Sequence, residues 1–104
     1  MKPTHNAGRI TEEQYTKLKL LGVRLRRSKT DLITEAIETI LSEDLSSENI
    51  PLYDSGLSSR QAGQVSEALN MRLKEAAIKC RCTKEAITSY AISRLAEQYA
   101  EYLC

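Results

Sequence analysis

The chain has 104 residues, of which 41% are apolar and 28% are charged, and its 15 basic side chains nearly balance its 14 acidic ones. These figures fit one small domain. A core is thin at this length, and the absence of Phe and Trp leaves only five Tyr as large buried side chains. The formal net charge of +1 argues against a nucleic-acid partner unless the charges are segregated along the chain.

The polar start, MKPTHNAGRI, resembles neither a signal peptide nor an amphipathic transit segment. No apolar run approaches the roughly 18 to 20 residues that a membrane span requires. The three cysteines, Cys80, Cys82 and Cys104, are an odd number and do not suggest a secreted disulfide framework. We therefore expect a cytoplasmic protein without a membrane partner.

The first predicted elements are a short extended segment, 4–10, and an amphipathic helix. Thr11 is followed by two glutamates, which is typical of a helix N-cap and an acidic first turn. Apolar residues then recur at spacings of three and four as far as Leu25. This periodicity predicts a helix with one buried face.

A second helix and a linker follow. Ser28 begins the pattern again, with Asp31 three residues later as a short version of a capping box. An apolar stripe runs from Leu32 to Leu41 and predicts the second helix. Residues 42–56 are rich in serine and acidic side chains and contain Pro51, so we interpret them as a linker.

The remainder of the chain repeats this plan. Shifted by 55 residues, Thr4–Ile40 matches Ser59–Leu95 at nine of 37 positions, where ordinary composition gives about two or three. We interpret the match as a tandem duplication, with a first unit at 1–41, the linker at 42–56 and a second unit at 57–104. Neither unit can bury its apolar stripes alone, so we expect both to share one core.

The two-helix run from Tyr15 to Leu41 resembles the ribbon-helix-helix (Arc/MetJ-type) DNA-binding proteins. The run at Ser28 to Ile33 and the Ala36-Ile37 pair carry the resemblance, and the second copy retains the helix spacing. That family works as a dimer. The resemblance therefore implies a mainly α fold with a short two-stranded antiparallel ribbon, built here as a pseudodimer in one chain.

In that family, alternate residues of the paired strands reach base edges in the major groove. The resemblance implies that the base-contacting residues are His5, Ala7 and Arg9 in the first copy and Arg60, Ala62 and Gln64 in the second. Arg can pair with guanine, Gln with adenine, and an alanine methyl can contact thymine. The two triplets differ, which predicts an asymmetric double-stranded DNA site.

The predicted inward strand positions depart from the family, where they are usually apolar. They are Asn6, Gly8 and Ile10 in the first copy and Gln61, Gly63 and Val65 in the second. Glycine weakens a strand and often marks a bulge. The ribbon could therefore be short or irregular, or could form only on DNA.

Seven of the 15 basic residues gather at the two turns between helices, a segregation that the net charge conceals. Both turns would lie near the DNA backbone in a pseudodimer. The family also holds a phosphate at the N-terminus of its second helix, where free amides favour an anion. Together these features imply phosphate contacts from Arg26, Arg27, Ser28, Lys29, Thr30, Arg81, Thr83 and Lys84.

Other chemistries have weaker support. Cys80 and Cys82 lack the four convergent ligands of a zinc site, and Cys80 aligns with Leu25, which favours core packing. His5 has no recognisable nucleophile as a partner. We expect no enzymatic activity, metal, cofactor or small-molecule effector. Near the C-terminus, extra packing and a surface that joins pseudodimers both remain open for Tyr90, Tyr99, Tyr102 and Leu103.

The sequence thus predicts a sequence-specific DNA-binding transcriptional regulator that represses by occupying a promoter. One alternative is an accessory DNA-binding protein for plasmid partition or conjugation. Another is a helical interaction module, antitoxin-like or a scaffold, whose degenerate ribbon no longer reads DNA.

Overall fold

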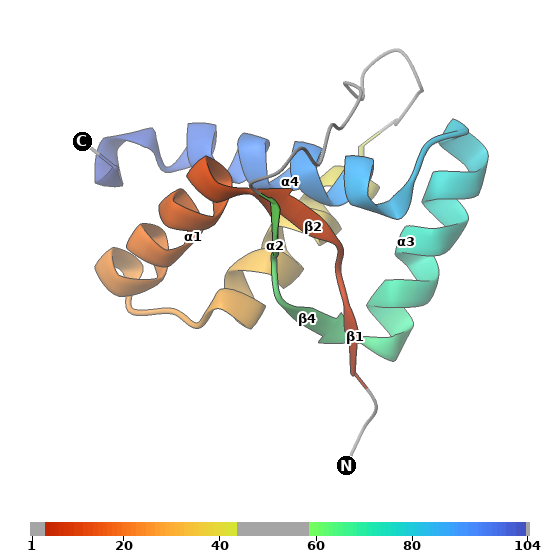
Figure 1. Ribbon diagram of the computed structural model, residues 1–104, viewed down its shortest axis with the longest axis horizontal. Coiled ribbons are helices and arrows are strands. Elements are labelled where there is room, and N and C mark those ends of the chain that lie inside the picture. The colour runs from red at the N-terminus through yellow and green to blue at the C-terminus, as the bar shows by residue number, and fades with distance from the viewer. Residues whose placement is uncertain (1–3, 44–58, 104) are drawn as a thin grey trace.

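A computed structural model describes residues 4–43 and 59–103, and it contains two β-α-α units (Figure 1). The first unit comprises β1 (Thr4–Asn6), β2 (Arg9–Thr11), α1 (Glu12–Leu25) and α2 (Lys29–Leu41). The second comprises β3 (Ser59–Gln61), β4 (Gln64–Ser66), α3 (Glu67–Cys80), α4 (Lys84–Gln98) and the 3-10 turn η1 (Ala100–Tyr102). The fold is mainly α with a short antiparallel ribbon that joins the repeats, as the sequence predicts. All of the expected linker except residues 42–43 lies outside the described residues.

The ribbon is antiparallel and is interrupted at its centre. β1 pairs with β4 and β2 pairs with β3. Between these two short ladders, the amide of Ala7 donates to the carbonyl of Gly63, and the amide of Ala62 donates to that of Gly8, both at 2.9 Å. Gly8 and Gly63 have φ values of +140° and +148°, which residues with a Cβ rarely adopt. The Ala-Gly pair of each copy therefore forms the break.

Side-chain caps begin the four helices at the residues that the sequence indicates. The side chains of Thr11, Ser28, Ser66 and Thr83 each accept a hydrogen bond from a backbone amide three residues later. Gln14 completes a capping box at Thr11, since its Oε1 atom accepts a hydrogen bond from the Thr11 amide at 3.0 Å. Each cap satisfies an amide that the helix itself leaves without a partner.

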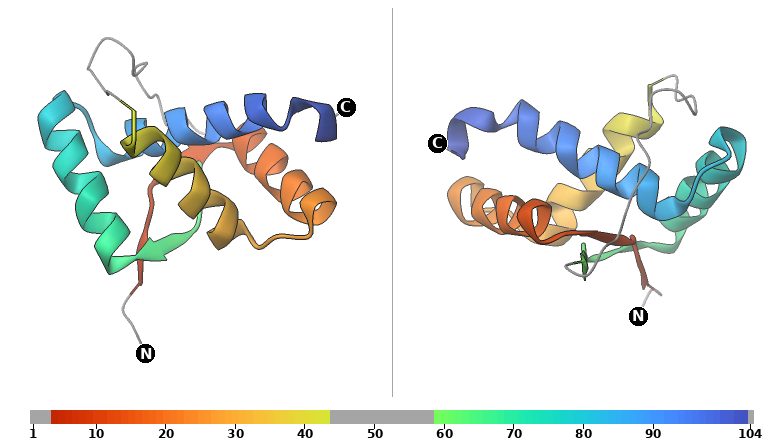
Figure 2. Two further views of the ribbon diagram at one scale, coloured as in Figure 1. Left: turned by 180° about the vertical axis from the view of Figure 1, so that it is seen from behind. Right: turned by 45° about the horizontal axis from the view of Figure 1, so that its top comes forward.

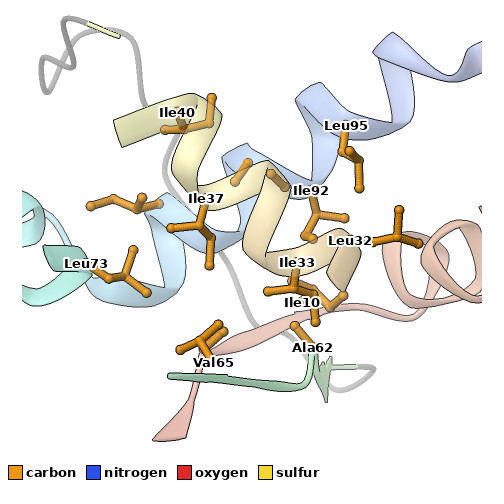
Figure 3. Close-up of a cluster of buried hydrophobic side chains, with 14 of the residues drawn as sticks. Ile10, Leu32, Ile33, Ile37, Ile40, Ala62, Val65, Leu73, Ile92 and Leu95 are labelled. Atoms are coloured by element: carbon orange, nitrogen blue, oxygen red, sulfur yellow. The ribbon is translucent and has the colours of Figure 1, made fainter. Parts of the chain in front are cut away.

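The core draws on both units. α2 and α4 cross behind the ribbon, while α1 and α3 lie at opposite flanks (Figure 2). Ala36 and Ala91, at matching positions on α2 and α4, are both buried. Figure 3 shows Ile33 of α2 directed at Ile10 and Ala62 of the ribbon. The ribbon thus closes one side of a core that neither unit could complete alone.

The segment after α4 packs back on the first unit. The hydroxyl of Tyr99 donates to Glu35 at 3.0 Å, and Arg24 donates to the carbonyl of Tyr102. Tyr99 and Leu103 are partly buried against the core, as is Tyr90 within α4, whereas Tyr102 is exposed. These contacts support the packing interpretation of this segment.

Candidate nucleic-acid interface

Four side chains able to recognise bases occupy the outer face of the ribbon. Asn6 lies opposite Gln64, and Arg9 lies opposite Gln61. All four residues are exposed. Ile10 and Val65, which follow Arg9 and Gln64 in the chain, point the other way and are fully buried. The ribbon therefore has one apolar face toward the helices and one polar face toward solvent.

The prediction that Ala7 and Ala62 face outward is wrong, because both are fully buried. A regular strand would place residues 5, 7 and 9 on one face. The Ala-Gly break inserts an extra buried position, so Ala7 and Gly8 both face inward and Arg9 returns outward. In this conformation neither alanine methyl is available to a base.

The structure also bears on the predictions that His5 and Arg60 face outward. His5 is only partly exposed and lies opposite Val65. Its Nε2 atom is buried and has no hydrogen-bond partner in the described part of the chain. Arg60 lies opposite Ile10 in the register, but its side chain falls outside the described residues. Arg9 and Gln64 are exposed where the sequence placed them outward.

Sequence reasoning missed Asn6 and Gln61, which it assigned to the inner face. Strict alternation through the segment produced that assignment. The signal that could have found them is the Ala-Gly pair in each copy, because a glycine within a strand often marks a bulge. Each bulge shifts the facing by one residue, and the shift exposes these two amides.

The turn residues fall into two groups. Arg26 and Arg81 are the exposed C-caps of α1 and α3, both in the left-handed conformation. Arg27 instead forms ion pairs with Asp31 at 2.6 Å and with Glu35 at 3.0 Å. The hydrogen bond that Arg27 donates to Asp31 is the main reason that the pKa of Arg27 is raised. Arg27 is therefore engaged within the protein in this conformation.

The helix N-termini predicted to hold phosphate each combine a hydroxyl cap with an acidic side chain in the first turn. Ser28 and Thr83 use their hydroxyls as caps. Thr30 is exposed in the first turn of α2, where α4 carries Glu85 instead. α2 also carries an acidic side chain in its first turn, Asp31, so a negative charge opposes an anion at both N-termini.

The two matching lysines also differ. Lys84 donates to the Asn6 carbonyl and to the Asn70 Oδ1 atom, both at 2.7 Å. Burial is the main reason that its pKa is lowered. Lys29 is exposed and donates to the Tyr15 hydroxyl at 3.0 Å. Lys84 thus ties α4 to the ribbon, while Lys29 lies on the surface of the first unit.

The described segments, 4–43 and 59–103, contain no group of three or more His, Cys, Asp or Glu side chains arranged to hold a metal. Cys80 is buried, and burial is the main cause of the raised pKa of the Cys82 thiol. No helix within those segments is both long and apolar enough to cross a bilayer.

Comparison of the chain with protein-family models, with curated proteins and with solved structures gives no significant match.

Proposed function

We propose that this chain is a tandem ribbon-helix-helix protein that binds double-stranded DNA sequence-specifically and regulates transcription, repressing by occupying a promoter. The observation that carries the proposal is the outer face of the ribbon, where Asn6, Arg9, Gln61 and Gln64 stand together and exposed. These are side-chain types that recognise adenine or guanine through paired hydrogen bonds.

The shape of the ribbon supports the same proposal. The major groove is wide enough to admit a two-stranded ribbon. Binding there would place the four polar side chains against base edges, while Ile10 and Val65 keep the helices attached behind them. Exposed Arg26, Lys29 and Arg81 would supply contacts to the DNA backbone, which set orientation and salt dependence.

The direct test is to titrate the full chain onto a DNA site obtained by selection, at several salt concentrations. We expect tight binding with a steep salt slope. The double change Arg9→Ala plus Gln64→Ala removes two of the four side chains that we propose recognise bases, Asn6, Arg9, Gln61 and Gln64, which we call the readers. We expect it to lower affinity for the selected site by about 100-fold or more while non-specific binding changes less.

A matched control makes the same two changes elsewhere. Arg94 and Gln98 are exposed on α4 and line a groove together with Thr39 and Leu95. This groove lies away from the ribbon, because Figure 3 shows Leu95 on the far side of the core from Ala62 and Val65. Arg94→Ala plus Gln98→Ala should leave site affinity close to wild type. Absence of binding to any duplex at low salt would refute the proposal and favour the interaction module.

A further inference from the structure

We infer that Arg9 and Gln64 make the DNA site a near-palindrome with one difference between its halves. A guanine lies where Arg9 reads, and an adenine lies at the matching position where Gln64 reads. Asn6 and Gln61 read adenine in both halves. This inference rests on the proposed function and specifies its ligand.

The backbone of the ribbon is almost symmetric. The repeat makes Gln61 the counterpart of Asn6 and Gln64 the counterpart of Arg9. The strand register pairs Asn6 with Gln64 and Arg9 with Gln61. Exchanging the two units therefore exchanges the two pairs and restores the same arrangement of main chain.

The bulges keep that symmetry. The two central amide-to-carbonyl bonds, from Ala7 to Gly63 and from Ala62 to Gly8, have equal lengths of 2.9 Å. The φ values of the two glycines differ by only a few degrees, at +140° and +148°. The backbone thus presents matching positions in the same way, and a difference in readout between the halves must come from the side chains.

Of the two positions in each copy to which we assign base recognition, one keeps its chemistry between the repeats and the other changes it. Asn6 and Gln61 both carry a terminal amide, which offers one donor and one acceptor to adenine. Arg9 and Gln64 differ, because a guanidinium has donors alone and matches the two acceptors of guanine. Among these four described side chains, the symmetry is therefore broken only between Arg9 and Gln64.

The centre of the ribbon offers no reader. Ala7 and Ala62 are fully buried, and their neighbours in the chain, Gly8 and Gly63, have no side chain. The four exposed readers thus form two pairs on either side of a gap, separated by about 10 Å, or roughly three base pairs, at ordinary strand spacing. We expect the base pairs under the gap to be unselected by direct contact.

The test is selection from random duplexes with the full chain as wild type, Arg9→Gln and Gln64→Arg. Wild type should return the site with guanine in one half and adenine in the other. Arg9→Gln should return adenine in both halves, and Gln64→Arg should return guanine in both. In competition, replacing the single guanine by adenine should weaken wild-type binding by about 10- to 100-fold and should favour binding of Arg9→Gln.

Arg94→Gln makes the same chemical change on α4 and serves as the control, and it should select the wild-type site. Circular dichroism of each variant establishes that it is folded. If wild type selects a perfect palindrome, or if folded Arg9→Gln and Gln64→Arg both select the wild-type site, the inference is overturned while DNA binding stands. If no folded variant, wild type included, enriches any duplex, the proposed function is overturned and the inference with it.

Discussion

Gly8 approaches the first turn of α4 so closely that a β-carbon on it would lie 3.1 Å from the Cα atom of Glu85. The contact is with backbone, which cannot rotate away, and the φ of Gly8 is already +140°. At Gly63, a β-carbon would lie 2.6 Å from the Cδ1 atom of buried Ile33, the end of a side chain that would have to shift, and the φ of Gly63 is +148°. Both positions therefore favour glycine, through the positive φ at each and through the backbone contact at Gly8.

Gly8→Ala and Gly63→Ala should each lower the free energy of unfolding by about 2 kcal/mol, since each combines backbone strain with a steric clash. Urea denaturation of the two variants measures the loss. Thr16→Ala, at an exposed position on α1, is the control and should change stability little. Wild-type stability in both glycine variants would contradict the close fit described for the bulges.

Thr88→Val should lower the free energy of unfolding by about 1 to 2 kcal/mol. Thr88 is fully buried, and its hydroxyl donates to the Ala7 carbonyl at 2.8 Å. Valine has nearly the same shape but leaves this buried carbonyl without the side-chain donor. Thr39→Val on the exposed face of α2 provides the comparison. Equal denaturation midpoints for the two variants would show that the bond adds nothing.

Lys84→Met and Lys29→Met should differ although the repeat makes the two lysines equivalent. Lys84 is the partner of Asn70, a side chain only 2% exposed. Its loss leaves a buried amide oxygen without that donor and should cost about 1 to 2 kcal/mol. Lys29 is exposed and contacts the hydroxyl and ring of partly buried Tyr15, which contributes about 0.5 kcal/mol. Thermal unfolding measures both, and equal losses would contradict the asymmetry.

The contact between Tyr99 and Glu35 should weaken at alkaline pH. The hydrogen bond to Glu35, with burial adding to it, raises the pKa of Tyr99 above its ordinary value of 10.0. The folded chain then holds the phenol proton more tightly than the unfolded chain does. The resulting stabilisation is complete below about pH 10 and is lost as pH rises through the folded pKa.

Tyr99→Phe lacks that bond at every pH. It should be less stable than wild type by about 1 kcal/mol at neutral pH, and the difference should shrink above pH 10. Urea denaturation across this range measures it. A difference that stays constant or grows with pH would contradict the assigned contact.

Arg26→Gly should separate stability from DNA affinity. Arg26 has φ 55°, a conformation that glycine adopts without strain, so the variant should gain about 1 kcal/mol of stability. If Arg26 contacts a phosphate, the same variant should bind DNA more weakly on every sequence and reduce the salt slope by about one unit. Arg81→Gly, at the matching turn, should behave in the same way. A loss of stability in both would argue against strain at these caps.

The sequence by itself determined the plan of this protein. The hydroxyl residues Thr11 and Ser28, and their counterparts in the second copy, start the helices because capping depends on local backbone amides. Periodic apolar residues predict the helices for the same local reason. The 55-residue repeat predicts that two units share a core, since neither could bury its own stripes.

The tertiary structure decided which side chains face outward. Strand facing depends on register, and a single inserted residue reverses it. The Ala-Gly pair signals a break in the strand, but the facing of Ala7 and Gly8 is fixed only by pairing with the opposite strand, where Gly63 accepts from the Ala7 amide. The engagement of Arg27 by Glu35, and of Lys84 by the ribbon, likewise arises from packing between elements far apart in the chain. Local sequence could therefore place the ribbon and the outward side chains of Arg9 and Gln64, but not those of Asn6 and Gln61.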